Sequence, residues 1–343
     1  MPRFRGLLRF AGKVLALSTV LILGAWSSLA VYYLPMPIVP LRFAAAVVVL
    51  GALAFGLQRR SMRTSLVAAA AAFIVVLGIW IGVRPDQSGE FPPETRELAQ
   101  AKIEGATAVV ENVRNFEYKT TSEFVARWEN RTFDLDRLKD VDLFFSYWDG
   151  NKAIAHTLLS FGFDDGQRLA CSVEVRRRVG QDYSTLEGFF KQYTLIYVWG
   201  DERDLVRLRT NVRKEEVYLY HTALAVADAR TLFVDMLQRT NELRGEPEFY
   251  NTVTENCTTV LFEHITRSTS IKVPWWERPI WNGYGDRTVY EEGVIVGKES
   301  FEATRRYAHI SARAQSIPDD AADFSERIRI EPAAEETTSD SDD

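Results

Sequence analysis

The sequence has few of the residues on which several common kinds of site depend. Its 343 residues include two cysteines and four histidines, too few cysteines for a disulfide-rich scaffold or for a zinc site with four cysteine ligands. It contains no HExxH, CxxC or Walker phosphate-binding sequence, so the usual signatures of zinc proteases, thiol redox proteins and P-loop nucleotide-binding proteins are missing. The sequence therefore predicts neither a metal site nor a cofactor.

The sequence also has no excess of basic residues. The chain has 41 lysines and arginines against 47 acids, a formal net charge of -6. Six of these acids lie in the last thirteen residues, Glu331–Asp343, which contain no lysine or arginine. The remainder is nearly balanced, so no nucleic-acid partner is expected. The composition of the end predicts an acidic disordered tail over residues 329–343.

Charges are also missing from three apolar runs near the N-terminus. The runs are Val14–Leu34, Phe43–Gln58 and Thr64–Val83. A helix needs about 20 mostly apolar residues to cross a bilayer, so we expect residues 1–84 to be a membrane anchor with three transmembrane helices. The second run is marginal in length. A signal peptide cleaved after Ser28-Leu29-Ala30 is the alternative interpretation of the first run.

The basic residues near these runs are unevenly distributed. Four basic residues precede the first run: Arg3, Arg5, Arg9 and Lys13. Three lie between the second and third runs: Arg59, Arg60 and Arg63. The connection between the first and second runs has one, Arg42. Basic residues favour the cytoplasmic side of a membrane. We therefore expect a multi-pass protein of a bacterial inner membrane, with a cytoplasmic N-terminus and a periplasmic domain after Val83.

The rest of the chain predicts one domain of the α+β class. Residues 85–107 are polar and contain prolines, which is typical of a linker, and residues 108–328 are long enough for one large domain. Its clearest element is a hairpin with strands at Ile154–Phe163 and Arg168–Arg177. A helix is expected at Ala225–Leu243 from its apolar periodicity, whereas Trp128–Leu138 is charged and expected to be irregular.

Cys257 is the strongest candidate for a catalytic nucleophile. It follows the polar residues Thr254, Glu255 and Asn256 and precedes an apolar run, a pattern that predicts a helix with the thiol in its first turn. The partial positive charge of a helix N-terminus favours the thiolate, which is the reactive form. A buried structural cysteine and a disulfide between Cys171 and Cys257 are the alternatives.

His156, on the first strand of the hairpin, is the candidate general base. His264 is seven residues after Cys257 on the same helix, about 10 Å away at 1.5 Å per residue, so it is too distant, whereas His221 remains possible. Glu174 on the return strand is the candidate for orienting the imidazole, with an ordinary surface glutamate as the alternative. The register is open, because different turns place either Glu174 or its neighbour Val175 opposite His156.

Several short motifs together resemble one family. They are Val113-Arg114-Asn115-Phe116, Leu143-Phe144-Phe145-Ser146-Tyr147-Trp148, Ala153-Ile154-Ala155-His156-Thr157, Phe161-Gly162-Phe163, Gly188-Phe189-Phe190, Tyr250-Asn251 and Glu255-Asn256-Cys257-Thr258-Thr259. The set resembles the domain labelled DUF4105, the periplasmic domain of Lnb-type lipoprotein intramolecular transacylases, over roughly residues 112–314. The order of His before Cys is similar to that of the permuted NlpC/P60 group.

The resemblance implies a permuted papain-like fold, with an antiparallel sheet and a cysteine-bearing helix. It also implies an acyltransferase that moves an acyl chain of a lipoprotein or phospholipid through a thioester on Cys257, with His156 as the base. In the characterised transacylases the membrane segments lie elsewhere relative to this domain, so the acyl donor and acceptor can differ here. A cell-wall peptidase or amidase with the same Cys–His pair and a non-catalytic membrane scaffold are the alternative functions.

Overall fold

The chain folds as two compact units. The first consists of Met1–Asp86 and Tyr183–Tyr193, and the second of Gln87–Asp182 and Thr194–Asp343. The computed structural model describes residues 2–35, 40, 42–47, 49–51, 62–148, 150, 152–271 and 282–330.

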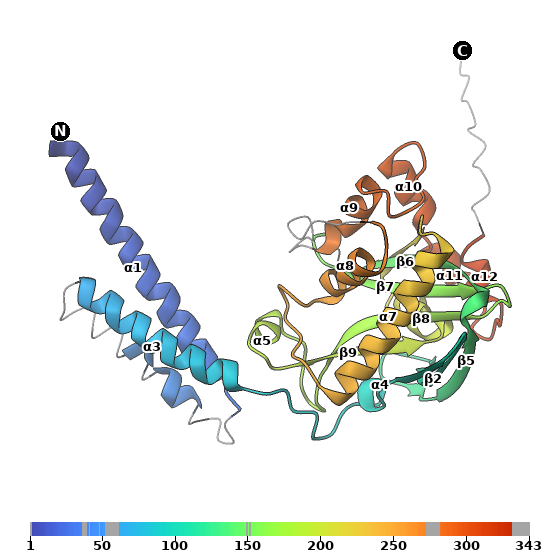
Figure 1. The fold of residues 1–343 in the computed structure, drawn as a ribbon, viewed down its shortest axis with the longest axis horizontal. Coiled ribbons are helices and arrows are strands. Elements are labelled where there is room, and N and C mark those ends of the chain that lie inside the picture. The colour runs from blue at the N-terminus through green and yellow to red at the C-terminus, as the bar shows by residue number, and fades with distance from the viewer. Residues whose placement is uncertain are drawn as a thin grey trace, which may run out of the picture. The chain divides into compact units, whose positions relative to one another are not determined.

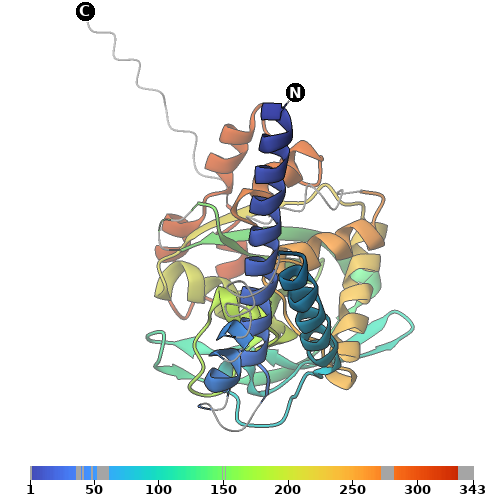
Figure 2. The same cartoon turned by 90° about the vertical axis from the view of Figure 1, so that its left-hand side faces the viewer.

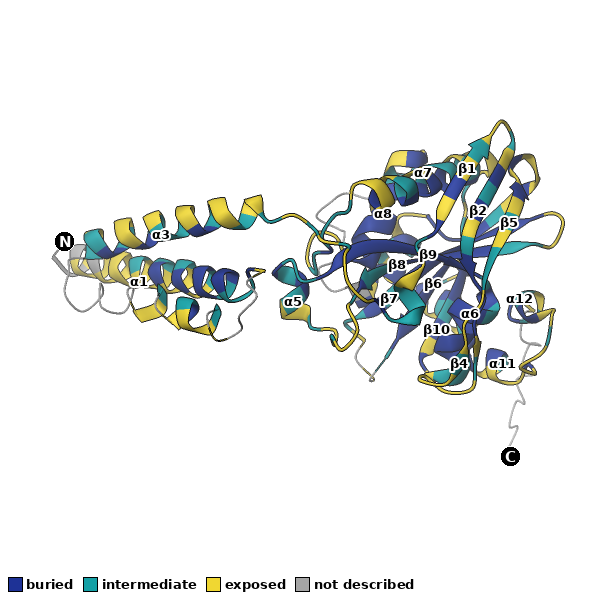
Figure 3. Cartoon of the chain, turned by 90° about the horizontal axis from the view of Figure 1, so that it is seen from below, coloured by how far each residue is buried: buried dark blue, intermediate teal, exposed yellow. Residues whose placement is uncertain are grey.

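Two long apolar helices dominate the first unit. Helix α1 (Pro2–Tyr32) packs along α3 (Met62–Gly82), with the Trp26 ring 5.0 Å from that of Phe73 and 5.6 Å from that of Trp80 (Figure 2). Both helices are long and apolar enough to cross a membrane. Both helices carry many exposed residues (Figure 3). Large apolar residues are among them, such as Leu15, Ile22, Val67 and Ile74. Such a surface fits a lipid environment better than water, because lipid-facing side chains carry no hydration cost.

Three transmembrane helices were predicted, but only two helices among the described residues are long and apolar enough to cross a membrane. In the described part of the second predicted run, the apolar helix Arg42–Gly51 is shorter than a membrane span needs. The rest of that run falls on residues 52–58, outside the described residues. The acidic end beyond Ile330 also lies outside them. The orientation of the anchor and the fate of its first segment stay predictions.

A short segment between two strands of the second unit belongs to the first. It carries helix α5 (Thr185–Phe189), which Ser184 caps. The ring of Phe190 stacks on Tyr33 at 5.4 Å. Lys191 Nζ donates to the carbonyl of Trp80 at 3.0 Å, and Gln192 Nε2 donates to that of Tyr33 at 2.9 Å. This segment, which the sequence assigned to the soluble domain, therefore packs with the anchor helices.

An eight-stranded sheet forms the centre of the second unit (Figure 1). The strands run in the order β1-β2-β9-β8-β7-β6-β10, with β5 paired to β2, and all neighbours are antiparallel except β2 and β9. The sheet is thus mixed, which corrects the predicted antiparallel sheet within an α+β fold. Its strands are β1 (Gln100–Glu104), β2 (Thr107–Arg114), β5 (Trp128–Asp134), β6 (Leu138–Tyr147), β7 (Ala155–Phe163), β8 (Arg168–Arg176), β9 (Thr194–Gly200) and β10 (Glu216–His221).

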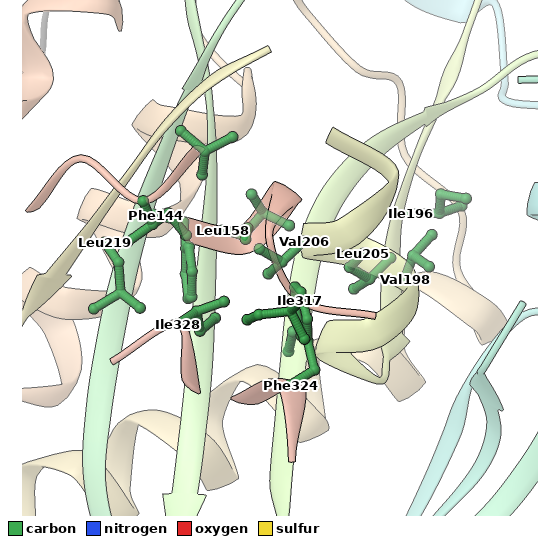
Figure 4. Packing of buried hydrophobic residues seen from close by; sticks show 14 residues of the cluster. Phe144, Leu158, Ile196, Val198, Leu205, Val206, Leu219, Ile317, Phe324 and Ile328 are labelled. Atoms are coloured by element: carbon green, nitrogen blue, oxygen red, sulfur yellow. The ribbon is translucent and has the colours of Figure 1, made fainter. Parts of the chain in front are cut away.

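Helices cover both faces of this sheet. On one face lie α7 (Val226–Gly245) and α8 (Cys257–Ser268), with Phe233 of α7 against Phe161 and Trp199. On the other face, a core cluster joins Leu158 of β7 to Phe324 of α12 (Figure 4). This second layer consists of α6 (Glu202–Arg207), the π-helical turn η2 (Leu208–Val212), α11 (Ser311–Gln315) and α12 (Phe324–Arg327). The sheet therefore separates the two layers, so a side chain on one face can meet a side chain from the other face only where a strand ends.

The remaining elements are short. They are α4 (Pro93–Arg96), the hairpin of β3 (Glu117–Tyr118) and β4 (Phe124–Val125), η1 (Leu135–Arg137), η3 (Asn282–Tyr284), α9 (Gly285–Glu291) and α10 (Phe301–Ala308). Strand β1 lies in the segment predicted as a linker, and β5 occupies the segment expected to be irregular. Arg329, in the predicted tail, forms ion pairs with the fully buried Asp142 and Glu202. Folded structure thus extends beyond residues 108–328 at both ends.

Candidate active site

Cys257 is the first residue of helix α8, as the sequence predicted. The Asn256 side chain caps the helix, because its Oδ1 accepts the backbone N–H groups of Thr258 and Thr259, each at 3.0 Å. Thr259 Oγ1 accepts the Asn256 N–H in return at 3.0 Å, which completes a capping box. Leu261 and Phe262 of this helix are fully buried, and the helix packs against β7 and β8. The thiol therefore has a fixed position in the field of the helix N-terminus.

His156 is the second residue of β7, and the register of the hairpin determines its neighbours. The pairing of β7 with β8 runs from Gly162 opposite Arg168 to Leu158 opposite Ser172, and continuing the same register would set His156 opposite Glu174. Because strand side chains alternate, His156, Ser172 and Glu174 lie on the same face of the sheet. The imidazole Nε2 is 2.6 Å from Ser172 Oγ and 3.3 Å from Glu174 Oε1. Of the alternatives left open by the sequence, the structure has the register that faces His156 toward Glu174.

The thiol and the imidazole meet where β7 begins. Cys257 Sγ lies 3.9 Å from the carbonyl oxygen of Ala155, and Thr157 Oγ1 lies 3.2 Å from Thr258 Oγ1. Burial alone would raise the pKa of the Cys257 thiol. The charge of His156 and a side-chain hydrogen bond with His156 outweigh that effect and lower the pKa to about 7. At neutral pH the thiol is therefore poised to form the nucleophilic thiolate.

The imidazole itself is held in its charged form. Burial disfavours that charge, but Glu174 and the Cys257 thiolate raise the pKa of His156 to about 9. Burial likewise opposes ionisation of Glu174, yet His156 and Arg209 hold the pKa of the Glu174 carboxyl well below its ordinary value. Arg209 NH2 lies 3.0 Å from Glu174 Oε1. The arrangement thus favours a thiolate beside an imidazolium, backed by a carboxylate.

Ser172 and Arg209 are the site residues that the sequence did not indicate. Ser172 is one serine in an alternating strand, and Arg209 lies 35 residues beyond Glu174 in the π-helical turn η2. Both side chains are buried. The one signal in the sequence was Ser172 sharing the strand face of Glu174, and no pattern pointed to Arg209.

The other histidines have partners away from the thiol. His221 Nδ1 lies 2.6 Å from Asp142 Oδ1, and His264 Nδ1 lies 2.5 Å from Asp235 Oδ2. His221 pairs with Asp142 of β6, four residues from Ser146, which pairs with His156. Of the two candidates, His156 is the one that has a hydrogen bond with the thiol. Within the described ranges, no group of three or more His, Cys, Asp or Glu side chains is arranged to hold a metal ion.

The second cysteine is separate from this site. Cys171 and Cys257, both within the described residues, form no disulfide with each other, so that alternative is wrong. Cys171 pairs with Leu159 and Trp199 in the sheet and is fully buried on the face opposite to Ser172. Burial raises the pKa of the Cys171 thiol well above its ordinary value, with a smaller contribution from Glu174. Only Cys257 is therefore suited to nucleophilic chemistry.

A glycine-containing turn packs against the beginning of β7. The Gly283 N–H donates to the carbonyl of Ala153 at 3.1 Å, and a Cβ added at Gly283 would lie 2.2 Å from the carbonyl oxygen of Lys152. A Cβ at Gly285 would lie 2.9 Å from the Phe145 ring and 3.4 Å from the Thr258 methyl group. The turn thus adjoins the elements carrying Cys257 and His156. The neighbouring aromatic residues Trp275, Trp276 and Trp281 lie outside the described residues.

One comparison with known proteins gives a match, and it covers the segment that carries this site. No curated protein and no solved structure is significantly similar to the chain. Residues 124–280 match the family model described as the Lnb N-terminal periplasmic domain, and this range includes both Cys257 and His156. The match, together with the two apolar helices near the N-terminus, indicates a membrane-anchored protein of the periplasm. Residues 124–280 are therefore similar to the N-terminal periplasmic domain of the Lnb family.

Proposed function

We propose that the protein is a membrane-anchored cysteine acyltransferase, which moves an acyl chain of a lipoprotein or phospholipid through a thioester on Cys257. The observation that carries this proposal is the pairing of Cys257 with His156. The thiol lies in the first turn of a capped helix, and the imidazole lowers its pKa to about 7. A thiolate at neutral pH is what attack on an ester carbonyl requires.

In the first half of the reaction, the Cys257 thiolate attacks the carbonyl carbon of an ester. A carbon–sulfur bond forms and the carbonyl electrons move onto oxygen. When the carbonyl re-forms, the carbon–oxygen bond of the ester breaks. The leaving alkoxide takes the proton of the His156 imidazolium, whose raised pKa keeps it protonated until that moment. The products are an alcohol, neutral His156 and an acyl thioester on Cys257.

In the second half, an amine accepts the acyl chain. The amine nitrogen attacks the thioester carbonyl, neutral His156 takes one proton from the nitrogen, and the carbon–sulfur bond breaks. An amide forms, and the thiolate–imidazolium pair is restored. A thioester suits this exchange, because thiolate is a better leaving group than alkoxide at neutral pH. The similarity of residues 124–280 to the N-terminal periplasmic domain of the Lnb family supports a lipoprotein N-terminus as the acceptor.

The membrane anchor supports a lipid-linked substrate. A substrate held in the same bilayer meets the enzyme in two dimensions, which raises its effective concentration near the thiol. The carboxylate of Glu174 supports the imidazole in both halves of the reaction, because its negative charge favours the protonated ring.

The test uses the full chain in lipid nanodiscs with a synthetic diacylglyceryl lipopeptide. Tandem mass spectrometry is expected to show one acyl chain moved from a glycerol ester to the N-terminal amine, and a thioester adduct on Cys257 in a quenched reaction. Cys257→Ala and His156→Ala should each abolish transfer, whereas Cys171→Ala should retain it. In bacteria, the N-termini of lipoproteins should lose the same N-linked chain when the gene is deleted.

Two outcomes would contradict the proposal. Release of free fatty acid or cleavage of cell-wall peptides, without N-acylation, would assign the Cys–His pair to a hydrolase. Equal turnover by the unaltered protein and by Cys257→Ala would indicate a scaffold without thiol chemistry. Reaction of Cys257 with a thiol-directed probe separates these cases, since a scaffold needs no activated thiol.

A further inference from the structure

A buried serine lies between the imidazole and its carboxylate. Ser172 has no exposed surface, and its strand neighbours Leu158 and Val198 both belong to the apolar core cluster. A hydroxyl in such surroundings is costly unless its hydrogen bonds are made. Here Ser172 Oγ is 2.6 Å from His156 Nε2 and 2.6 Å from Glu174 Oε1. Each of these contacts is shorter than the 3.3 Å between His156 Nε2 and Glu174 Oε1.

The direction of these hydrogen bonds follows from the proton count. An ionised carboxylate can only accept, so the single hydroxyl proton of Ser172 is donated to Glu174. Ser172 Oγ must then accept from the imidazole, which places a proton on His156 Nε2. The other ring nitrogen, Nδ1, is left for the hydrogen bond with Cys257. The network thus selects the tautomer that can receive the thiol proton.

The carboxylate end of this chain is fixed from a second element. Arg209, in the π-helical turn η2, lies 3.0 Å from Glu174 Oε1 and 3.5 Å from Ser172 Oγ. Its other amino group donates to the carbonyl of Leu205 at 2.6 Å, which ties it to the preceding helix. Single π-helical turns in helices are frequent at functional sites. The charged groups around His156 are Cys257, Glu174 and Arg209, and those around Arg209 are Glu174, Arg213, Glu215 and Arg114.

We propose that Ser172 is a positioning residue, whose hydroxyl carries the hydrogen bond between His156 and Glu174. It selects the ring tautomer and orientation, and Glu174 acts on the imidazole mainly through it. This inference rests on the proposed role of the Cys257–His156 pair. It predicts that Ser172 and Glu174 act as one unit. Once one of the two side chains has been removed, removing the other should change the pKa of Cys257 little further.

The test measures how fast the Cys257 thiol is alkylated. This measurement needs no acyl substrate. The full chain in detergent is treated with iodoacetamide over a range of pH, and alkylation of Cys257 is measured by mass spectrometry. With Ser172→Ala the imidazolium is held less firmly, so the pKa of Cys257 rises. A rise of one unit lowers the alkylation rate below that pKa about tenfold. Ser172→Ala and Glu174→Ala together should resemble either substitution alone.

A matched control exists on the same face of the sheet. Ser160 is also fully buried on β7 and donates its hydroxyl to a buried carboxylate, Glu202, at 2.5 Å. Ser160→Ala removes a similar bond away from His156 and should leave the pH profile of Cys257 unchanged. Equal profiles for Ser172→Ala and the unaltered chain, equal shifts for Ser172→Ala and Ser160→Ala, or additive effects of Ser172→Ala and Glu174→Ala would each overturn the proposal.

A second pair of variants decides the case if Ser172→Ala does not fold. Threonine and valine have nearly the same shape and differ in one hydroxyl. Ser172→Thr should therefore keep the profile of the unaltered chain, and Ser172→Val should shift it. Identical profiles for the two would overturn the role of the hydroxyl. The two proposals can fail separately. If the pH profile of Cys257 alkylation shifts in Ser172→Val but the unaltered protein transfers no acyl chain, the positioning role of Ser172 is upheld and the acyltransferase function is rejected.

Discussion

At the scale of single residues, the pKa values of the thiol and the imidazole define a working range of pH. The pKa of Cys257 is lowered to about 7, and that of His156 is raised to about 9. The thiolate is present above the lower value and the imidazolium below the upper one. We therefore expect a bell-shaped pH dependence of acyl transfer, with its limbs near these two values.

His156→Ala should move the acidic limb of thiol reactivity to higher pH. Without the imidazolium, burial is the remaining large influence, and burial raises the pKa of the Cys257 thiol. Alkylation of Cys257 near pH 7 should then fall by about tenfold or more, as expected for a shift of one pKa unit or more. Cys171→Ala is the control, since that thiol is fully buried on the other face of the sheet. An unchanged profile in His156→Ala would mean that the helix N-terminus alone activates the thiol.

The residues that sequence could identify were those with local signals. Cys257 followed a helix-start pattern, and His156 stood on one strand of a recognisable hairpin. The register between His156 and Glu174 could not be read, because it depends on the backbone of the turn, where Gly166 adopts a positive φ of 85°. The role of Arg209 could not be predicted from the sequence, because its π-helical turn lies next to β8 only in the folded protein.

At the scale of elements, the position of the thiol depends on the cap of α8. Asn256→Ala removes the acceptor of the Thr258 and Thr259 N–H groups and should lower the free energy of unfolding by about 1 kcal/mol. Asn256→Asp keeps an acceptor, so stability should be retained. Its added negative charge should raise the pKa of Cys257. Thermal unfolding and the pH profile of alkylation measure the two effects separately.

The contrast between these two variants is the informative result. If both lose the same stability, the Asn256 side chain acts mainly through the bond that it donates to the Thr252 carbonyl at 3.1 Å, which aspartate cannot make. If Asn256→Asp leaves thiol reactivity unchanged, the charge at the helix start matters less than the hydrogen bond with His156.

Elements were predicted well where an apolar period was long. Helix α7 lies where the sequence placed a helix, because the apolar residues recur at a helical period over its whole length. Strand β5 was missed, since its charged residues Glu129 and Arg131 pair with each other and with Asp201 rather than facing solvent alone. Such pairing depends on tertiary structure and leaves no local signal.

At the scale of the whole molecule, the distribution of arginines predicts the topology. A reporter enzyme that is active only in the periplasm should be active when fused after Arg84 and inactive when fused after Arg60. A cytoplasmic reporter should give the reverse pattern and serves as the control. Cytoplasmic activity after Arg84 would place Cys257 on the side of the membrane that lipoproteins leave, and would remove them as substrates.

The chain passes between the two units three times, after Asp86, after Asp182 and after Tyr193. For anyone who wishes to produce the second unit as a soluble protein, cutting once before Gln87 is therefore insufficient. The excised protein would still carry the α5 segment, and Phe190, now 2% exposed, would lose Tyr33 as its stacking partner. Such an apolar surface promotes aggregation. Replacing residues 183–193 with a short polar turn between β8 and β9 is the remedy that this connectivity suggests.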